Sequence, residues 1–401
     1  MLVRDHYHLS YCTNIHPGKT WEAVFASLEQ YALPLKQALS PDKPFGIGLR
    51  LSRQASLELG TGERLRQFKA WLNRHDCYVF TMNGFPYGGF HGQRVKDHVH
   101  QPDWTTTERL EYTLLLFDQL AELLPEGMEG GISTSPLSYK PWFEGEPEKR
   151  EAAFLTGTRH LLEVARHLDE IFQRTGRYLH LDLEPEPDGL LENTDEVLDY
   201  YANWLLPSAQ DAFAGHMEGP AIDQLVRRHL TICYDVCHYA VEFEEPRDAF
   251  LRMREAGIKV GKIQISAALK AMLPEDDEGR QSIAQALSPF NESTYLHQVI
   301  EKKENGELQQ FPDLPEALAT LGDRGGREWR CHFHVPLFVE AFGLLSSTQD
   351  EILKVLEIAR REPLTRHLEV ETYTWDVLPP ELRLDLKDSI EREFRWVKDR
   401  L

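Results

Sequence analysis

A carboxylate and an imidazole stand three residues apart at the end of an apolar stretch, in the run Tyr234-Asp235-Val236-Cys237-His238. An acidic side chain at the end of a buried strand loses hydration, so it needs a hydrogen-bonding partner or a cation. The pair is open to two interpretations. Either Asp235 is paired with a neighbouring donor and His238 lies on a solvated loop, or both residues bind a metal ion.

Other apolar runs end in the same residue types. Polar and apolar side chains alternate along Leu179-His180-Leu181-Asp182-Leu183-Glu184, which puts Glu184 uppermost on the polar face. Carboxylates and imidazoles gathered at strand ends are ligands for a borderline or hard divalent ion, such as Mn, Zn, Mg or Co. The candidate metal ligands are Glu184, Asp235, Gln264, His332, His334 and Glu371.

Each candidate ligand also has a purely structural interpretation. Glu184 could form an ion pair with Arg50, and His332 and His334 could be buried histidines with satisfied hydrogen bonds. Glu371 could belong to an exposed strand face. A metal site is favoured because these residue types recur at the ends of successive strands.

A glycine- and aromatic-rich segment, residues 82–92, follows another apolar run and suits the recognition of a polar, ring-bearing or polyol ligand. The same segment could instead be a turn whose aromatic side chains seal one end of the fold. Arg50 is a fixed positive charge at a strand end. The candidate substrate-binding residues are Asn14, Arg50, Asn83, Tyr87, His91, Glu186 and His238; the candidate catalytic residues are Glu184, Glu371 and His238.

Short apolar runs alternate with longer segments of helical period along the whole chain, which is typical of repeated βα units. One expected helix begins at the capping residue Thr106. The predicted strands are Tyr7–Cys12, Phe45–Leu51, Tyr78–Met82, Gly131–Thr134, Tyr178–Glu184, Leu230–Asp235, Val260–Ser266 and His367–Glu371, with Arg330–Val335 as a doubtful ninth.

Eight parallel strands with helical crossovers predict an α/β fold, the (β/α)8 TIM barrel, whose chemistry lies on the loops after the strands. A doubly wound open sheet is the alternative, although no Gly-x-Gly-x-x-Gly follows the first strand. The whole chain, residues 1–401, is expected to form one domain. A charged, Pro- and Gly-containing segment at about 269–328 is predicted to be an insertion between the seventh and last strands, over the active face.

The composition restricts the possible partners. A formal charge of −21 repels phosphate backbones and anionic lipid heads, so the protein is not expected to bind nucleic acid. The sequence has neither a signal peptide nor an apolar segment long enough to enter a bilayer. Five scattered cysteines without a Cys-x-x-Cys pair favour a reducing compartment, and the expected location is the cytoplasm.

In order and type, the strand-end residues resemble those of the xylose-isomerase-like TIM barrels, a superfamily that includes sugar isomerases, epimerases and the endonuclease IV group. Residues 232–238 resemble its Asp-Thr-Cys-His strand, Glu184 falls at its first metal Glu, and Val370-Glu371-Thr372 resembles its final strand. The His332-Phe333-His334 pair sits where endonuclease-IV-like members carry Asp-x-His. One departure is Gln264, which replaces a metal-binding His and is a weaker ligand. Either His332 and His334 supply the lost nitrogen, or metal binding is weak or absent.

A narrower resemblance rests on residues 10–18, the Asn-Gly-Phe-Pro-Tyr-Gly loop, residues 183–187 and residues 371–375. These segments are similar to the EboE family, described as metabolite-traffic proteins found in bacterial clusters beside a prenyltransferase-like membrane protein. The resemblance spans nearly the whole chain. It implies partners within one pathway, including that membrane protein.

The leading hypothesis is a metal-dependent isomerase or epimerase acting on a small polyol, sugar or sugar phosphate, or an aromatic-linked metabolite. The ion would polarise an oxygen, Glu184 or Glu371 would move the proton, and His238 and Arg50 would orient the substrate. A non-catalytic binding or carrier protein is the alternative and agrees with Gln264. An abasic-site endonuclease is disfavoured by the negative charge.

Overall fold

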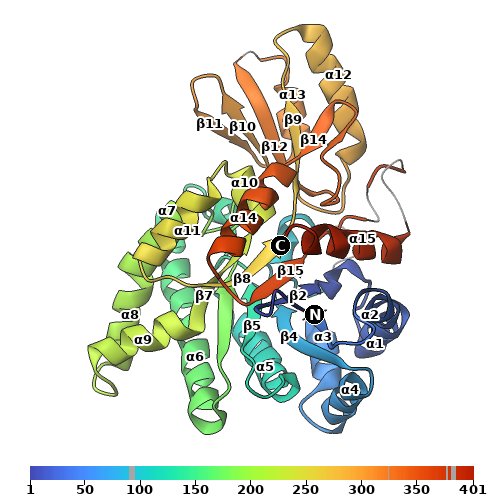
Figure 1. Ribbon diagram of the computed structural model, residues 1–401. Coiled ribbons are helices and arrows are strands. Elements are labelled where there is room, and N and C mark those ends of the chain that lie inside the picture. The colour runs from blue at the N-terminus through green and yellow to red at the C-terminus, as the bar shows by residue number, and fades with distance from the viewer. Residues whose placement is uncertain (90–94, 324, 376–377, 381–384) are drawn as a thin grey trace.

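The computed structural model describes residues 1–89, 95–323, 325–375, 378–380 and 385–401. A parallel sheet forms the centre of the molecule, in the order β2-β15-β8-β7-β6-β5-β4-β3, with the short β1 antiparallel to β2 at one edge (Figure 1). A parallel bridge from Cys12 to Gly48 joins β2 to β3 and closes the sheet into a barrel. The predicted TIM barrel is confirmed.

The barrel strands lie within one or two residues of the predicted ranges at nearly every end. They are β2 (Tyr7–Tyr11), β3 (Phe45–Arg50), β4 (Cys77–Asn83), β5 (Gly130–Thr134), β6 (Leu179–Leu183), β7 (Leu230–Asp235), β8 (Val260–Ile265) and β15 (His367–Val370), with β1 (Leu2–Val3) outside the barrel. Sequence order and spatial order agree around the ring. The carboxyl ends of all eight strands therefore open on one face.

Helices surround the barrel and connect its strands. They are α1 (Trp21–Ser27), α2 (Leu33–Leu39), α3 (Arg53–Leu59), α4 (Glu63–Arg74), α5 (Thr107–Leu123), α6 (Pro147–Thr175), α7 (Thr194–Tyr200), α8 (Leu206–Phe213), α9 (Gly219–His229), α10 (Val236–Val241), α11 (Pro246–Glu255), α14 (Gln349–Arg361) and α15 (Leu386–Lys398). The Thr106 side chain accepts a hydrogen bond from the Arg109 amide and begins α5 as predicted. In α4, Leu65, Phe68 and Leu72 recur at helical spacing and are buried against the core.

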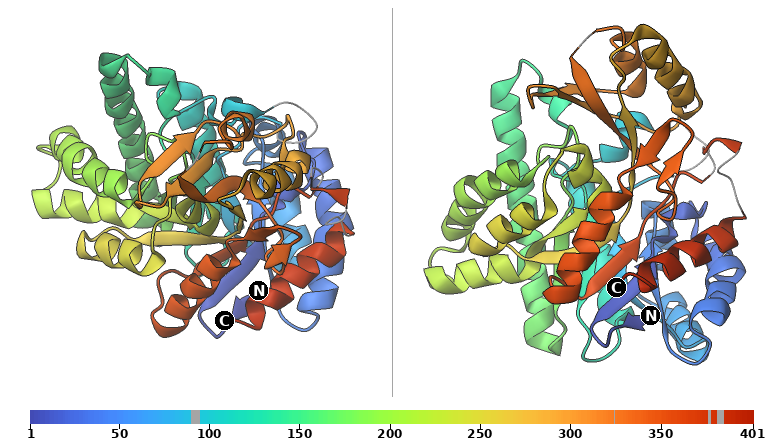
Figure 2. Two further views of the ribbon diagram at one scale, coloured as in Figure 1. Left: turned by 90° about the horizontal axis from the view of Figure 1, so that it is seen from above. Right: turned by 45° about the horizontal axis from the view of Figure 1, so that its top comes forward.

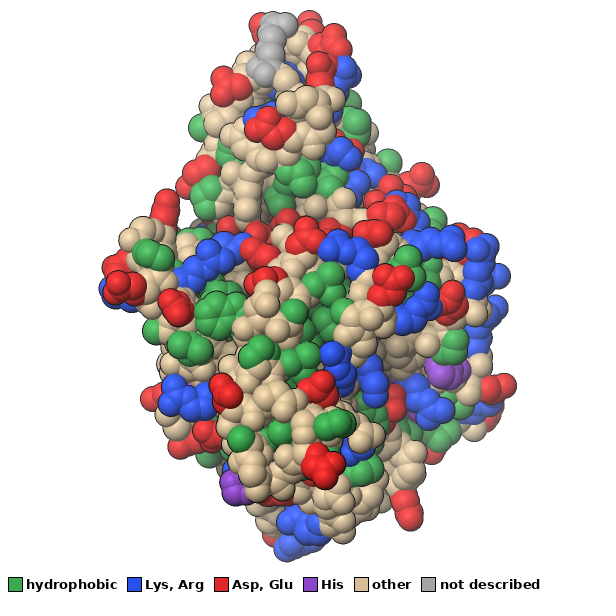
Figure 3. Space-filling model, turned by 90° about the vertical axis from the view of Figure 1, so that its left-hand side faces the viewer, with side chains coloured by type: hydrophobic (Ala, Val, Ile, Leu, Met, Phe, Trp, Pro, Cys, Tyr) green, Lys and Arg blue, Asp and Glu red, His purple; other side chains and the backbone are tan. Residues whose placement is uncertain are grey.

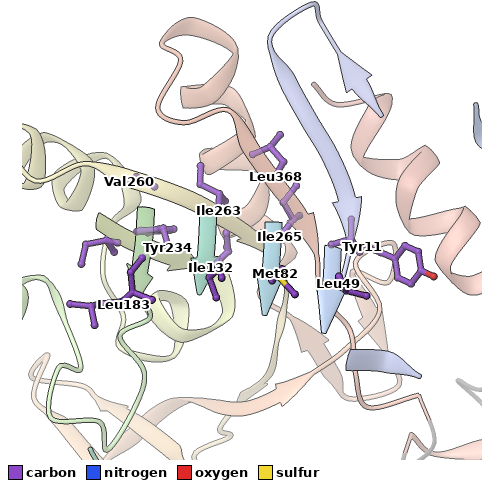
Figure 4. Close-up of a cluster of buried hydrophobic side chains, with 14 of the residues drawn as sticks. Tyr11, Leu49, Met82, Ile132, Leu183, Tyr234, Val260, Ile263, Ile265 and Leu368 are labelled. Carbon is purple, nitrogen blue, oxygen red and sulfur yellow. The ribbon is translucent and has the colours of Figure 1, made fainter. Parts of the chain in front are cut away.

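The apolar core lies between the barrel strands and the helices, because alternate strand residues point outward. Figure 4 shows at least one such side chain from each barrel strand. Burial of one Leu or Ile side chain stabilises the fold by about 1.5–3 kcal/mol. The inward residues are largely polar. In the barrel interior, the Lys262 ammonium lies 2.7 Å from the Glu369 carboxylate, and both side chains are fully buried.

A second, antiparallel sheet is inserted between β8 and α14 and stands over the barrel (Figures 1 and 2). Its order is β11-β10-β12-β9-β14-β13. It comprises β9 (Ala268–Met272), β10 (Val299–Lys303), β11 (Leu308–Phe311), β12 (Gly326–His334), β13 (Ala341–Phe342) and β14 (Leu345–Ser347), with helices α12 (Asp277–Leu287) and α13 (Leu314–Ala319).

The second sheet differs from the sequence-based prediction in extent. It runs from residue 268 to residue 347, whereas the predicted insertion ends at about 328. The doubtful strand Arg330–Val335 belongs to β12, which pairs antiparallel with β9 and β10 and takes no part in the barrel. An apolar strand pattern does not identify the sheet that the strand joins.

The surface carries charges of both signs. Figure 3 shows one side of the molecule, on which acidic and basic side chains are interspersed. Within the described residues, no helix is long and apolar enough to cross a membrane.

Candidate metal centre

Three buried carboxylates converge where β6, β7 and β15 end. One oxygen from each of Glu184, Asp235 and Glu371 lies within 4.8 Å of the other two. Burial and the Asp235 charge raise the pKa of Glu184 well above its usual range, and burial and the Glu184 charge do the same for Glu371. Such mutual repulsion is relieved by protons or by a cation.

Asp235 is fixed so that one oxygen remains available. Its Oδ1 accepts hydrogen bonds from the Cys237 amide at 2.8 Å, the His238 amide at 3.2 Å and the Ser266 hydroxyl at 2.6 Å. The first two bonds cap α10. Burial opposes ionisation of Asp235, but the His238 and His334 rings and these hydrogen bonds outweigh it and lower its pKa. Asp235 Oδ2 has no hydrogen-bond partner within the described part of the chain.

Three imidazoles lie beside the carboxylates, and each is oriented through Nδ1. The His238 Nδ1 lies 3.0 Å from the Pro185 carbonyl, the His332 Nδ1 lies 2.9 Å from Gln298 Oε1, and the His334 Nδ1 lies 2.8 Å from the Glu371 carbonyl. An oxygen acceptor at Nδ1 selects the tautomer with a free Nε2, which is the usual second contact of a metal-binding histidine.

The imidazoles are suited to bind a cation in their neutral form. Burial lowers the pKa of His238, lowers that of His334 to about 4, and lowers that of His332 well below its usual range. Metal ligation requires the neutral ring. The Nε2 atoms of His332 and His334 and the Oε2 atom of Glu184 are buried without a hydrogen-bond partner among the described residues. The donor set therefore fits a divalent ion.

The ligand atoms form overlapping groups. Asp235 joins Glu184 and Glu371 in one group and His238 and His334 in a second, while His238 joins Glu186 and His332 in a third. All members of the three groups are buried. Asp235 and His238 thus connect the barrel carboxylates to the imidazoles of β12, which the second sheet supplies.

Gln264 does not present its oxygen to the carboxylates. Its Oε1 accepts a hydrogen bond from Cys233 Sγ at 2.8 Å, while its Nε2 donates to Glu371 Oε2. Gln264 thus differs from its predicted role as a metal ligand. It acts as a donor that holds Glu371.

A cavity opens above the candidate metal centre, with about 580 Å³ of empty space including its mouth. Glu184, Glu186, Glu371, His238 and His332 line its polar part. Apolar side chains of both sheets' loops line the rest, namely Phe85, Pro86, Val95, Val99, Tyr295, Leu296 and Tyr373.

The predicted substrate-binding residues separate into two sets. Asn14 and Asn83 line the cavity and donate to Glu371 Oε1 at 2.6 and 3.1 Å. Arg50 does not line it; its guanidinium donates to the carbonyls of Gly18, Pro86 and Gly88, which holds two loops together.

Tyr87 lies against Tyr112, with ring centroids 5.1 Å apart, and packs on the core outside the cavity lining. Glu186 and His238 line the cavity, in agreement with their predicted position. His91 lies outside the described residues.

Two residues of the cavity lining, His100 and Gln298, were not predicted from the sequence. His100, at the end of the 3-10 helix Lys96–His100, places Nε2 3.3 Å from Glu186 Oε1. Burial lowers the pKa of His100 to about 3 and raises that of Glu186 well above its usual range. Gln298 orients His332 and donates to the Pro187 carbonyl at 3.0 Å. Neither residue lies at a barrel strand end, the signal on which the predictions depended.

Comparisons with known proteins give a fold. No protein-family model and no curated protein matches the chain. A xylose isomerase-like TIM barrel protein from Mycobacterium smegmatis, solved in complex with magnesium, aligns over 100% of this chain and 98% of its own with 10% identity and a TM-score of 0.51. The IOLI protein with a bound zinc atom aligns over 97% and 96% with 11% identity and a TM-score of 0.47.

A probable 3-DHS dehydratase, AsbF, involved in petrobactin synthesis from Bacillus anthracis, aligns over 99% of this chain and 100% of its own, with 13% identity and a TM-score of 0.45. At such identities the likeness shows the fold alone. The chain has the xylose-isomerase-like TIM barrel fold, and its structural neighbours include proteins with bound Mg or Zn.

Proposed function

We propose that the protein is a divalent-metal-dependent isomerase or epimerase of small polyhydroxylated metabolites. The observation that supports this most is the set of three buried imidazoles, each engaged through Nδ1, beside three buried carboxylates. Asp235 would hold the ion together with Glu184 and Glu371 on one side and His238 and His334 on the other. A bound divalent ion supplies polarisation of a carbonyl or hydroxyl oxygen.

The hydrogen bonds assign different roles to the two glutamates. Glu371 accepts from Asn14, Asn83 and Gln264, which fixes its carboxylate. Glu184 Oε2 has no such partner among the described residues, and burial raises the pKa of Glu184. A carboxylate oxygen without a fixed donor is able to accept the proton from the carbon next to a carbonyl group. Glu184 is therefore the proposed proton-transfer residue, and Glu371 a fixed ligand.

The cavity favours an uncharged substrate. Among the described lining residues, Lys96 carries the fixed positive charge, and the Lys96 ammonium forms an ion pair with Asp313 at 2.5 Å. Arg50, the other candidate for binding a phosphate, is engaged by backbone carbonyls. Three buried carboxylates, Glu184, Glu186 and Glu371, line the polar wall and disfavour a phosphate group. The proposed substrate is an unphosphorylated sugar or polyol, whose apolar ring face lies against the aromatic wall.

Deuterium incorporation tests the proposal. Metal-loaded protein is incubated in D2O with a panel of unphosphorylated aldoses, ketoses and cyclic polyols, and mass spectrometry follows exchange at carbon. We expect exchange into at least one compound, its loss in Glu184→Gln, and its retention in Glu163→Gln, a change at an exposed residue of α6. A panel sugar that binds to the metal-loaded protein without exchange would contradict an isomerase.

The second candidate is a binding or carrier protein, and the orientation of Gln264 favours it. An amide that donates to Glu371 withdraws one potential oxygen ligand from the candidate metal centre. This function agrees with an EboE-type role in metabolite traffic, with a prenyltransferase-like membrane protein as a pathway partner. Its test is a ligand that is retained through purification and released unchanged, together with co-purification of the membrane protein after co-expression.

A further inference from the structure

A second group of potential ligands lies at the opposite end of the barrel from the candidate metal centre. One ligand atom from each of Glu129, His180 and His367 lies within 4.8 Å of the other two. All three residues lie at the amino ends of strands: Glu129 precedes β5, His180 is the second residue of β6, and His367 is the first residue of β15. A surface cavity reaches Glu129 and His180 from this end.

His180 is oriented as a metal-binding histidine usually is. Its Nδ1 lies 2.6 Å from Asp182 Oδ1, and Asp182 Oδ1 also accepts a hydrogen bond from the Thr231 hydroxyl. No hydrogen bond within the described chain engages the Nε2 atom of His180. A carboxylate that accepts from one ring nitrogen fixes the tautomer, directs the other nitrogen toward a cation and increases its basicity.

His367 is a fully buried imidazole without a good hydrogen bond. Neither ring nitrogen forms a hydrogen bond of normal geometry with another described residue. The backbone of Glu129 lies nearby and raises the pKa of the ring slightly, which opposes the larger effect of burial. Burial lowers the pKa of His367 well below its usual range, so the ring is neutral at pH 7. A buried polar atom without a partner is destabilising unless a ligand satisfies it. The His367 ring lies 5.2 Å from the His180 ring, centroid to centroid.

The backbone leaves space for this arrangement at two glycines. A Cβ atom added at Gly131 would lie 2.3 Å from the Cε1 atom of His180, and one at Gly261 would lie 1.9 Å from Asp182 Oδ1. Real Cβ atoms do not approach other atoms so closely. Any larger residue at either position would displace the His180–Asp182 pair.

We propose that Glu129, His180 and His367 bind a zinc-class divalent cation at the amino-terminal end of the barrel. Two imidazoles and one carboxylate form a common three-ligand set for zinc, which leaves a fourth position for water. Glu129 and Asp182 supply the negative charge, while Lys259 and Arg366 line the same cavity without contacting the proposed ligands within ion-pair distance.

This amino-terminal site is independent of the candidate metal centre. Three residues of β15 lie between His367 and Glu371, and the four steps from one to the other correspond to a rise of about 13 Å along a strand. The Lys262–Glu369 ion pair fills the interior between them. Because its ligands lie at the opposite end of the barrel from the cavity above the candidate metal centre, the proposed site does not depend on the proposed function.

Anomalous diffraction tests the proposal. Crystals of the full chain are grown after metal removal and addition of two equivalents of zinc, and data are collected on both sides of the zinc edge. We expect one anomalous peak between His180 and His367, in addition to any peak near Asp235. An anomalous peak near Asp235 with none between His180 and His367 would overturn the proposal. So would crystals at full zinc saturation in which no zinc lies beside His180.

Variants give a second measurement in solution. Glu129→Gln alters a half-buried side chain that forms no ion pair within the described part of the chain, so the variant should fold. We expect zinc affinity at this site to fall more than about tenfold by isothermal titration. The matched control is His6→Gln, because His6 lines the same cavity but is not a proposed ligand. Equal zinc stoichiometry and affinity in Glu129→Gln and wild type would refute the assignment.

Discussion

Replacing Glu184 with Gln should have opposite effects on stability without and with a metal ion. Without metal, Glu184, Asp235 and Glu371 face one another within 4.8 Å. At an effective dielectric constant of about 20, two full charges at that distance repel by about 3.5 kcal/mol. Protonation relieves part of this repulsion, because the pKa of Glu184 is raised. We therefore expect metal-free Glu184→Gln to be more stable than metal-free wild type by about 2 kcal/mol at pH 8.

With metal, the order should reverse. A ligand present at 1,000 times its dissociation constant stabilises the native state by about 4 kcal/mol. An unfolding entropy of about 2.1 cal/mol/K per residue over 401 residues converts 4 kcal/mol to about 5 °C and 2 kcal/mol to about 2 °C. Wild type should gain about 5 °C on saturation with Mn, and Glu184→Gln should gain much less because it has lost a ligand of the candidate metal centre.

Thermal unfolding followed by circular dichroism, with EDTA and with saturating metal, measures both effects. Glu163→Gln removes the same formal charge from an exposed position on α6 and should leave both melting temperatures unchanged. A Glu184→Gln protein that melts below wild type in EDTA and shows the wild-type gain with metal would refute the reasoning. That result would mean that Glu184 is a structural carboxylate.

Three further predictions follow from single contacts. Gln264→His places an imidazole beside Glu371, so titration calorimetry should show a metal affinity about tenfold higher than that of wild type. An unchanged affinity would show that the residue at this position of β8 does not bind the ion. Burial raises the pKa of Glu393 to about 8, so ionisation of this group lowers the stability of the fold as the pH rises from 4.5 to 8. Urea unfolding should show that Glu393→Gln raises the free energy of unfolding by up to about 4 kcal/mol at pH 9 and changes it little at pH 5. Arg50→Met leaves three carbonyls without their donor, so the free energy of unfolding in urea should fall by about 2–3 kcal/mol while the metal stoichiometry stays unchanged. A changed stoichiometry would show that Arg50 contributes to the candidate metal centre.

The barrel was predictable because its strands are marked by local patterns. Alternation along residues 179–184 and the apolar run 230–233 fix both the strand and the direction of its side chains. The extent of the second sheet was not predictable. β12 pairs antiparallel with β9 across more than 50 residues of chain and with β10 across more than 20, and no local pattern encodes such partners.

The candidate site was predictable where it lies on barrel strands. Asp235 and Glu371 converge because parallel strands bring their carboxyl ends to one face. The position of Arg50 outside the cavity was not predictable from the sequence. Its acceptors are backbone carbonyls of two distant loops, and such contacts leave no pattern in a sequence. His100 was missed for a similar reason, since it reaches Glu186 from a loop that has no periodic pattern.

The replacement of a barrel imidazole by Gln264 is consistent with a metal centre displaced toward the second sheet. Gln264 donates to Glu371, so the group at the strand ends consists of carboxylates alone. One step above it, Asp235 also belongs to the group that contains His238 and His334. The imidazole absent from β8 is thus matched by one from β12, which makes the second sheet part of the proposed centre instead of only a cover. Removing residues 268–347 should then abolish metal binding at the candidate metal centre even if the barrel folds, and full affinity at that centre in such a deletion variant would assign it to the barrel alone.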